Sequence, residues 1–534
     1  MDRSLGAGIM ARMEHRDKAV VIGAGMGGLA AAIRLAALGL DVTVVETAEA
    51  PGGKARAVPS DAGPVDTGPT VLTLRSVFDD LFALAGQRLD DHVRLIAQPI
   101  LARHWWAQGE TLDLFSESEA NIEAIRAFAG AREASAFARF DRLSTALYDA
   151  FEGPVLQAPR PDPGRIARTA LRQPRLWPAL LPGMTLQRLL QTHFRDPRLI
   201  QLFARYATYV GGRPAHSPAV LALIWRAEAA GVWAIEGGMH GLALALARLG
   251  QSLGVRFTYA TRARRILRQG GHVTGVEVEG GHTLPCRYCV FNGDPGALAE
   301  GHLGEAAQAA LPAQTARKAV RPSLSAQVWA FAGRPHGADL VHHNVFFSDD
   351  PRAEFGPIGK GQMPLAPTLY ICAQDRATDG PARSDGLERF EIILNAPSGA
   401  APHPDEEAQC RIRTFHRLKD MGLTFSPEPG ALALTTPGDL ARLYPGSGGA
   451  IYGRTPEGLM AAFQRPTAQT ALPGLFLAGG GAHPGAGVPM AALSGRHAAE
   501  AISADRISAS KSAPTATPGG MSMVSRRTAR APFR

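Results

Sequence analysis

Residues 19–47, AVVIGAGMGGLAAAIRLAALGLDVTVVET, decide the fold of this chain. The stretch consists of a short apolar run without alternation, a glycine turn, a helical segment and a second apolar run, which predicts strand, turn, helix and strand. Gly23, Gly25 and Gly28 form the spacing G-x-G-x-x-G. The first glycine permits a tight turn, the second lets a pyrophosphate approach the backbone, and the third allows close packing of helix against strand. The pattern predicts a dinucleotide-binding unit.

Glu46 ends the second strand and strengthens this prediction. It lies 18 positions after Gly28, close to the ~20 expected for an acid that holds a ribose hydroxyl. The helix that begins near Met26 would direct its N-terminal N–H groups at the phosphates. Two other interpretations are a glycine-rich packing turn and a membrane-spanning helix, which needs about 20 apolar residues. Five glycines between positions 23 and 39, and the charges in the stretch, argue against a span.

Length and composition indicate a multidomain globular protein. The chain has 534 residues, 45% of them hydrophobic and 19% charged, enough for two or more domains of ~100–200 residues. Of the net charge of +8, six positive charges follow position 505, where no acid occurs. The basic character therefore describes a tail, and we expect no nucleic-acid binding.

Cysteine use indicates a reducing compartment, because there are only four cysteines. Cys286 and Cys289 form a C-x-x-C pair that could be a redox or metal pair or two plain buried thiols, and no second pair or spaced histidines accompany it. We predict no metal site. We expect no signal peptide, because the first apolar run is the nucleotide-binding strand itself, and no membrane span elsewhere.

The window from Arg160 to Arg198 has an unusual composition. It contains eight arginines and only two acids, with leucines and Trp177 between them, and three prolines that break any long helix. Basic segments with leucine and tryptophan are typical of the surface of an anionic membrane. We predict peripheral membrane docking here, with a solvated basic face over an ordinary helical core as the alternative.

Three distant pieces of the chain are expected to converge. They are the glycine fingerprint, the region around Gly237 and Gly238, and the closing loop GGGAHPGAGVPM at residues 479–490, which precedes a helix. A nicotinamide enzyme typically needs only the first piece. A flavoprotein uses a late strand, loop and helix to place a helix N-terminus beside the flavin ring, where it stabilises negative charge. The sequence therefore favours FAD over NAD.

Motifs between residues 18 and 505 resemble the carotenoid oxidoreductases of the bacterial phytoene-desaturase family. The similar segments are VVIGAGMGGLAAAIRLA, PGGKA, DTGPT, ATYVGGRPAHSPA, GVWAIEGGMHGLALAL, HHNVFFSDDPRAEF, PTLYICAQDR, LYPGSGGAIYG and GGGAHPGAGVP. Within the family, GVWAIEGGM and ARYATYVGG most resemble the 1-hydroxycarotenoid 3,4-desaturases, also called methoxyneurosporene or hydroxyneurosporene dehydrogenases, of spheroidene and spirilloxanthin synthesis.

The resemblance implies FAD as the cofactor and an acyclic carotenoid as the substrate. It implies an α/β fold with a Rossmann-like FAD-binding domain that is discontinuous in sequence, a mixed α+β substrate domain and a helical membrane-facing subdomain. By position in the motifs, the FAD-binding residues are Gly23, Gly25, Gly28, Glu46, Gly53, Lys54, Ala263, Gly481, Gly485, Gly487 and Val488. At Ala263 relatives often carry valine, but a backbone contact does not need that side chain.

Six boundaries divide the chain by composition and motif. We predict a flexible extension at 1–17, FAD-binding segments at 18–115 (with the start of the substrate domain), 231–300 and 431–505, a helical substrate and membrane region at 116–230, a substrate domain at 301–430 and a disordered basic tail at 506–534.

The implied reaction converts a CH–CH pair of a polyene into C=C. Hydride transfer from an allylic carbon to the flavin and proton loss from the neighbouring carbon need mainly positioning and an apolar tunnel. No catalytic residue is assigned. Residues that could accept a proton or bind a hydroxyl group of the substrate are Glu228, Glu236, His240 and His483, and His483, inside the closing loop, is the candidate for proton acceptor. Aromatic residues that could line the tunnel are Trp105, Trp106, Tyr206, Tyr209 and Trp233.

Several alternatives stay open at this point. An earlier desaturase acting on phytoene would share the fold and FAD, a flavin amine oxidase would have a polar amine pocket, and a non-catalytic lipid carrier would bind no FAD. We expect a quinone or oxygen as electron acceptor, and a position on the cytoplasmic side of the inner or photosynthetic membrane.

Overall fold

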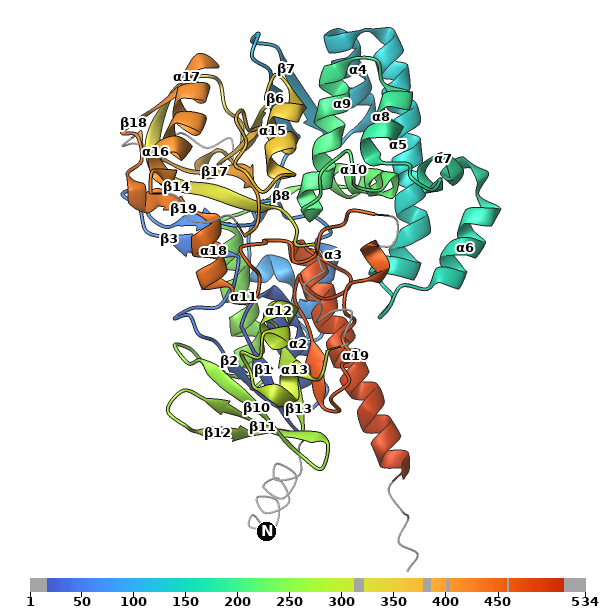
Figure 1. Cartoon of the computed structure of the whole chain (residues 1–534), viewed down its shortest axis with the longest axis vertical. Coiled ribbons are helices and arrows are strands. Elements are labelled where there is room, and N and C mark those ends of the chain that lie inside the picture. The colour runs from blue at the N-terminus through green and yellow to red at the C-terminus, as the bar shows by residue number, and fades with distance from the viewer. Residues whose placement is uncertain (1–16, 312–320, 378–385, 400–403, 459–460, 513–534) are drawn as a thin grey trace, which may run out of the picture.

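The computed structural model describes residues 17–311, 321–377, 386–399, 404–458 and 461–512 (Figure 1). The predicted extension at 1–17 therefore lies outside the described residues except for Asp17, and so does the tail from 513 onward. Among the described residues, no helix is long and apolar enough to cross a membrane.

A five-stranded parallel sheet forms the lower half of the molecule in Figure 1, in the order β20-β13-β1-β2-β9. Its strands come from the three segments predicted to bind FAD, so this sheet is discontinuous in sequence as expected. The strands are β1 (Lys18–Ile22), β2 (Asp41–Val45), β9 (Arg256–Thr258), β13 (Tyr288–Phe291) and β20 (Leu475–Leu477). All pairings are parallel, and β1 is buried on both faces, which explains its unbroken apolar run.

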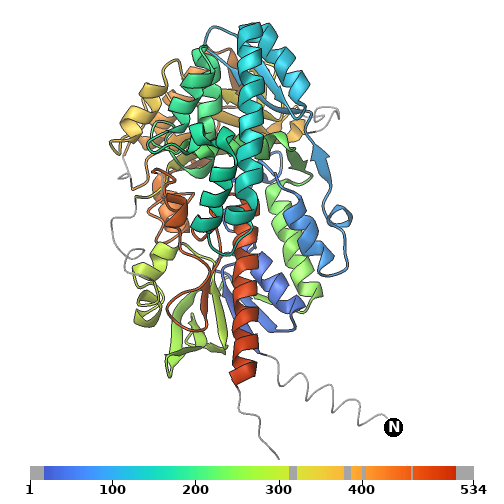
Figure 2. The same cartoon turned by 90° about the vertical axis from the view of Figure 1, so that its right-hand side faces the viewer.

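Helices α2 (Met26–Ala37), α11 (Gly238–Ser252) and α19 (Val488–Ser512) pack on this sheet. α2 and α19 cross at glycines: a Cβ on Gly495 would lie 2.3 Å from the carbonyl oxygen of Gly27. This close approach brings the N-terminal ends of both helices to the same side of the sheet. Figure 2 shows α19 continuing downward below the long helix α5 (Ala131–Phe151).

A mixed sheet occupies the upper half, in the order β18-β14-β17-β16-β15-β6-β7, with β19 beside β14. β14 and β17 pair over nine residues, and the inward side chains form a separate aromatic core. The strands are β6 (Ile100–Trp105), β7 (Thr111–Phe115), β14 (Ser325–Gly337), β15 (His343–Phe346), β16 (Leu369–Ala373), β17 (Glu388–Ala396), β18 (Leu423–Ser426) and β19 (Leu434–Thr435).

A helical region stands beside the mixed sheet (Figure 1). Trp225, Phe137 and Phe203 pack there as edge-to-face and stacked rings 5.6–5.7 Å apart. Besides α5, its helices are α4 (Ser118–Ala129), α6 (Pro163–Arg172), α7 (Trp177–Leu180), α8 (Leu186–His193), α9 (Pro197–Ala204) and α10 (Leu223–Ala229). The prolines at 174, 178 and 182 interrupt this region as predicted, so α6 and α7 are short.

Smaller elements connect the layers. They are β3 (Arg56–Val58) with β4 (Val65–Thr67), β5 (Leu95–Ala97) with β8 (Trp233–Ile235), the three-stranded sheet of β10 (Ala263–Gln269), β11 (His272–Val278) and β12 (Thr283–Pro285), and the helices α3 (Ser76–Ala83), α12 (Pro295–Ala299), α13 (Glu305–Gln308), α15 (Pro351–Ile358), α16 (Glu406–Arg411), α17 (Arg417–Asp420) and α18 (Pro437–Leu443).

The predicted start of the tail at 506 is wrong by two helical turns, because α19 continues to Ser512. Arg506 anchors these turns: its Nε donates to Asp17 Oδ2 at 3.0 Å and its guanidinium to the Leu38 carbonyl at 3.2 Å. Serine and alanine were among the residues whose content predicted disorder after position 506, but both are compatible with a helix once its base is held this way.

Candidate active site

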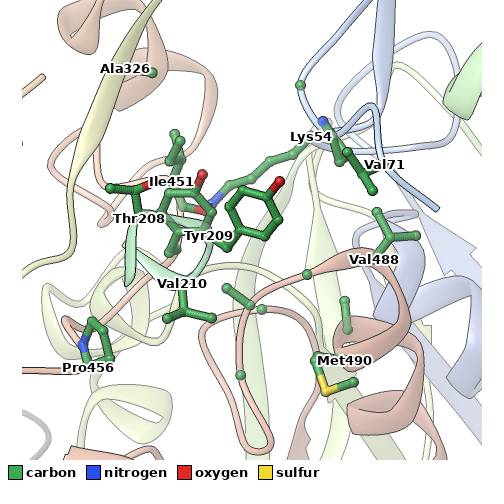
Figure 3. A pocket seen from close by; sticks show the side chains of 18 of the residues that line it. Lys54, Val71, Thr208, Tyr209, Val210, Ala326, Ile451, Pro456, Val488 and Met490 are labelled. Atoms are coloured by element: carbon green, nitrogen blue, oxygen red, sulfur yellow. The ribbon is translucent and has the colours of Figure 1, made fainter. Parts of the chain in front are cut away.

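A single cavity of about 2440 Å³ runs between the two sheets and into the helical region. Typical small-molecule sites measure about 300–1,000 Å³, so this cavity has room for a dinucleotide and a second large ligand. Figure 3 shows Lys54, Tyr209, Val488 and Met490 around the same space, although they come from three distant parts of the chain.

The glycine turn forms one wall of the cavity. Gly25 caps α2 without a side-chain hydrogen bond, and the first turn of the helix has no acidic residue. The first N–H groups of α2 therefore have no partner from the helix or from a capping side chain. They belong to a part of the cavity wall that consists mainly of glycine backbone. Gly53 packs against Gly25 so closely that a Cβ on Gly53 would lie 3.1 Å from the Gly25 Cα. Such a wall suits an anion such as a pyrophosphate.

Glu46 lies at the end of β2, beside the glycine turn. Its Oε2 accepts the N–H of Ala24 at 2.6 Å and its Oε1 accepts that of Ala48 at 2.8 Å. Two backbone donors orient the carboxylate in the cavity wall, next to Ala263 of β10 on the same side. This is where the sequence predicts the ribose and adenine end of the cofactor.

Three buried charges lie farther along the wall. Lys54 Nζ donates to the Ile451 carbonyl at 2.6 Å, and Asp294 accepts the N–H of Gly296 at the start of α12. Burial lowers the pKa of Lys54 and raises that of Asp294, while the attraction between the two charges opposes both shifts. Arg465 is the third charge, and burial lowers its pKa to about 10, so it stays protonated at neutral pH.

Arg465 holds the closing glycine loop. Its guanidinium donates to the carbonyls of Gly480 at 2.9 Å, Tyr452 at 3.0 Å and Arg454 at 2.8 Å. The loop leads into α19, whose first residue, Val488, lines the cavity. The N-termini of α2 and α19 therefore border one space, and a helix N-terminus favours negative charge on a group that lies against it.

The structure brings together most of the residues predicted to bind the cofactor. The residues in the cavity wall are Gly23, Gly25, Glu46, Gly53, Lys54, Ala263, Gly481, Gly485, Gly487 and Val488. Gly28 is not in the wall: a Cβ there would lie 2.1 Å from the Gly23 carbonyl oxygen. This is the helix–strand packing role that the motif assigns to its third glycine.

His483 does not line the cavity, although it lies in the closing loop. Its Nε2 is 3.0 Å from the Ala158 carbonyl oxygen, and its ring stacks on His497. Burial lowers its pKa to about 4, so it is neutral at pH 7. The placement favours a structural role, which ties the loop to the segment after α5.

Of the other predicted proton acceptors, Glu228 and His240 line the cavity, whereas Glu236 lies outside it and pairs with Arg94 at 3.8 Å. Among the predicted aromatic residues, Trp106 and Tyr209 are in the wall and Trp105, Tyr206 and Trp233 are in the surrounding core. Most of the remaining wall is apolar, with Val220, Leu221, Leu223, Ile224, Ala227, Val345, Phe347 and Ile393.

Sequence reasoning missed Asn292 and Arg465. Asn292 follows β13, and its Nδ2 lies 3.3 Å from the Gly23 carbonyl oxygen, so it packs against the glycine turn. The buried strand that ends in VFNGD was a usable signal, because ligands bind at the carboxyl ends of parallel strands. Nothing near Arg465 in the sequence marks it.

Asp66, in the DTGPT turn, caps α11 from outside. It accepts the N–H groups of Met239 and His240 at the start of that helix. Burial raises its pKa from 3.8 to about 6, although these hydrogen bonds oppose the shift. A raised folded-state pKa gives stability that is complete below about pH 4 and is lost as the pH rises through about 6.

We expect the wild type to lose about 2 kcal/mol of unfolding free energy relative to Asp66→Asn between about pH 4 and pH 7, because the asparagine does not titrate. Urea unfolding of both proteins at the two pH values measures this gap. A gap that stays constant, or one that favours the wild type at higher pH, would contradict the assignment.

The site fits FAD on its own geometry. Bare glycine backbone, a helix N-terminus without a cap, a carboxylate beside it and a second helix N-terminus follow one another along a single wall. Packing of the fold alone does not require these four features to follow one another along one wall.

Comparisons with known proteins agree with this geometry. The family model for flavin-containing amine oxidoreductases matches residues 26–503. Hydroxyneurosporene desaturase of Rhodobacter capsulatus is 62% identical over 93% of this chain and 100% of its own length, and that of Cereibacter sphaeroides is 63% identical over 92% and 99%. The solved structure of cyclohexylamine oxidase from Brevibacterium oxydans has the same fold, with a TM-score of 0.55 at 17% identity, over 92% of this chain and 100% of that one.

Proposed function

The chain belongs to the family of flavin-containing amine oxidoreductases, and from that premise we propose that it is an FAD-dependent carotenoid desaturase. It introduces the C-3,4 double bond into 1-hydroxy or 1-methoxy acyclic carotenoids such as 1-hydroxyneurosporene, in spheroidene or spirilloxanthin biosynthesis. The observation that carries this proposal is that one cavity continues from the glycine-rich wall into an apolar part lined by residues such as Val220, Leu223 and Phe347. We call this part the apolar chamber. The near-complete match with hydroxyneurosporene desaturases supports the choice of substrate.

The chain's residues contribute binding, orientation and exclusion of water. The N-terminal N–H groups of α2 and the carboxylate of Glu46 would hold the dinucleotide, and Lys54 and the N-terminus of α19 would interact with its ring end. When bound, FAD supplies the acceptor for a hydride from the allylic carbon of the polyene. The apolar wall orients that carbon, and a proton leaves the neighbouring carbon.

We infer that the substrate enters from a membrane. The cavity reaches Ile166 and Ala170 of α6 and Leu180 of α7, while the outer side of the same helices exposes Leu171 and Trp177. Leu171 is 73% exposed and Trp177 is 50% exposed. Arginines surround these side chains, which suits an anionic bilayer. A peripheral position on the cytoplasmic side, with a quinone or oxygen as acceptor, completes the proposal.

The double variant Leu171→Glu/Trp177→Glu is expected to bind anionic vesicles at least tenfold more weakly than the wild type, because it loses two apolar anchors and gains two negative charges. Co-sedimentation with vesicles measures the binding. Leu432→Glu is the matched control. Leu432 is fully exposed and lies two residues before β19, which is on the opposite side of Figure 1 from α6. Equal sedimentation of the double variant and the wild type would refute docking through this surface.

A panel of carotenoids tests the function. FAD-loaded protein is incubated with vesicles that contain phytoene, neurosporene or 1-hydroxyneurosporene, in the presence of a quinone, and products are identified by mass and absorption. We expect loss of two hydrogens and a red shift with the hydroxylated carotenoid. Preferred turnover of phytoene would instead assign the protein to the first desaturation of the pathway.

A further inference from the structure

Three polar side chains, those of Arg205, Tyr209 and Glu228, meet in the wall of the apolar chamber, and Tyr206 packs behind them in the core. Arg205 follows α9, and its guanidinium donates to Glu228 Oε1 of α10 at 3.2 Å and to the Tyr209 hydroxyl at 2.5 Å. Arg205 is 8% exposed and Glu228 is 2% exposed. Tyr206 lies against Arg205 and Tyr209 within the aromatic core of the helical region. A buried ion pair in such a place does not favour stability by itself, so its retention calls for another role.

The cluster has unused hydrogen-bonding capacity. Among the described residues, Glu228 Oε2, Arg205 Nε and the Tyr206 hydroxyl have no hydrogen-bond partner. Buried polar atoms are nearly always paired, and here an acceptor and a donor stand open on one ion pair. Only one of the two bonds that an arginine and a carboxylate usually share is formed. The open positions match a ligand group that donates one hydrogen bond and accepts one.

The cluster also lies in the right place for a substrate. Arg205, Thr208, Tyr209 and Glu228 all line the cavity. Figure 3 shows Tyr209 beside Lys54 and across from Val488, at the end of the chamber that adjoins the cofactor wall. The ion pair has no net charge, so it suits a neutral polar group better than an ammonium or a carboxylate.

We propose that the Arg205–Glu228 pair is the specificity site for the terminal hydroxyl of the carotenoid, which donates to Glu228 Oε2 and accepts from Arg205 Nε. This inference rests on the proposed function. In a 1-hydroxycarotenoid the hydroxyl-bearing carbon is two bonds from C-3, so the group that is recognised and the bond that is oxidised must lie side by side. Binding the hydroxyl near Tyr209 therefore places C-3 and C-4 at the cofactor wall.

A comparison of two substrates distinguishes recognition by hydrogen bonding from recognition by shape. The 1-hydroxy and 1-methoxy forms of the same carotenoid have the same polyene, but the ether cannot donate to Glu228. We expect the wild type to prefer the hydroxy form by about tenfold or more in kcat/KM and in Kd, as for a hydrogen bond to a charged group. Quenching of protein fluorescence by the carotenoid gives Kd without turnover.

Glu228→Gln is expected to lower the hydroxy-to-methoxy ratio at least threefold, because the neutral amide oxygen accepts the hydroxyl's hydrogen bond more weakly than the carboxylate does. Tyr209→Phe is expected to lower the ratio about threefold, because Tyr209 orients Arg205. Tyr209→Phe keeps the shape of the side chain and decides the question if Glu228→Gln fails to fold. Tyr148→Phe is the matched control: it removes a hydroxyl from the same cavity wall but from α5, away from the cluster, and should leave the ratio unchanged.

Unchanged ratios in both cluster variants would overturn the inference, and so would an equal loss in Tyr148→Phe. Because each ratio compares two ligands of one protein, a general loss of folding or flavin does not imitate the expected result. If the wild type desaturates neither carotenoid, the proposed function fails, but the Kd ratios still decide whether this pair binds the hydroxyl.

Discussion

Gly25→Val is expected to purify without flavin and without desaturase activity. Gly25 lies where α2 begins, in the cavity wall, and a Cβ there would lie 2.8 Å from Asn292 Nδ2 and 3.9 Å from the Gly53 Cα. A branched side chain fills the space through which a pyrophosphate reaches the N–H groups of the helix. We expect FAD content to fall at least tenfold, measured by flavin absorption per protein after gel filtration.

Gly39→Asn is the matched control for this change. Gly39 ends the same helix with φ +83°, in open surroundings, and asparagine tolerates that conformation. The control should keep its flavin and unfold at nearly the wild-type temperature. A flavin-loaded Gly25→Val protein would show that the glycine turn is not the phosphate site.

Arg465→Gln is expected to lose about 3–5 kcal/mol of unfolding free energy. The guanidinium is buried and donates to the carbonyl of Gly480 in the closing loop and to those of Tyr452 and Arg454 in the segment beside it. Each bond from a charged donor contributes about 1.5–3 kcal/mol. Glutamine reaches at most one of these carbonyls and leaves Asp294 with less compensating charge. Chemical denaturation of the FAD-loaded protein measures the change, and weaker flavin retention should accompany it.

Arg454→Gln provides the comparison for Arg465. Arg454 NH1 donates one bond, to the Gln464 carbonyl at 2.9 Å, near the surface. Its replacement should cost less than about 1 kcal/mol, within the range of exposed substitutions. Similar losses in both variants would mean that the closing loop does not depend on Arg465.

The local pattern of the sequence predicted the cofactor half of the molecule well. Strand β1, the start of α2 at Met26 and strand β2 follow from an apolar run, a glycine spacing and a second apolar run. The packing role of Gly28 and the late helix at Val488 follow from the same motif logic. These features could be predicted because each depends on residues that are close together in the chain.

The features that were missed depend on contacts between distant residues. Arg465 donates to the carbonyls of Gly480 and Tyr452, which lie in separate irregular segments of the chain. No periodicity or spacing in the sequence predicts these contacts. His483 sits within a motif that faces the flavin, yet its side chain turns toward Ala158. The end of α19 depends on Asp17, almost the whole chain away.

The Arg205–Glu228 pair is another contact between distant residues that the sequence did not predict. Glu228 was one of several predicted proton acceptors, and only the fold shows that it meets Arg205 inside the chamber. Sequence spacing carried no signal for that pair, because Arg205 follows α9, Glu228 lies in α10, and a glycine turn and two prolines lie between them.

The most direct test of the account is a single turnover without an acceptor. FAD-loaded protein is mixed anaerobically with 1-hydroxyneurosporene, and flavin absorption and carotenoid mass are followed together. The account predicts that the yellow flavin absorption bleaches in step with one equivalent of a product that has two fewer hydrogens. Product without bleaching, or bleaching without that product, would contradict the claim that the flavin wall and the apolar chamber act as one site.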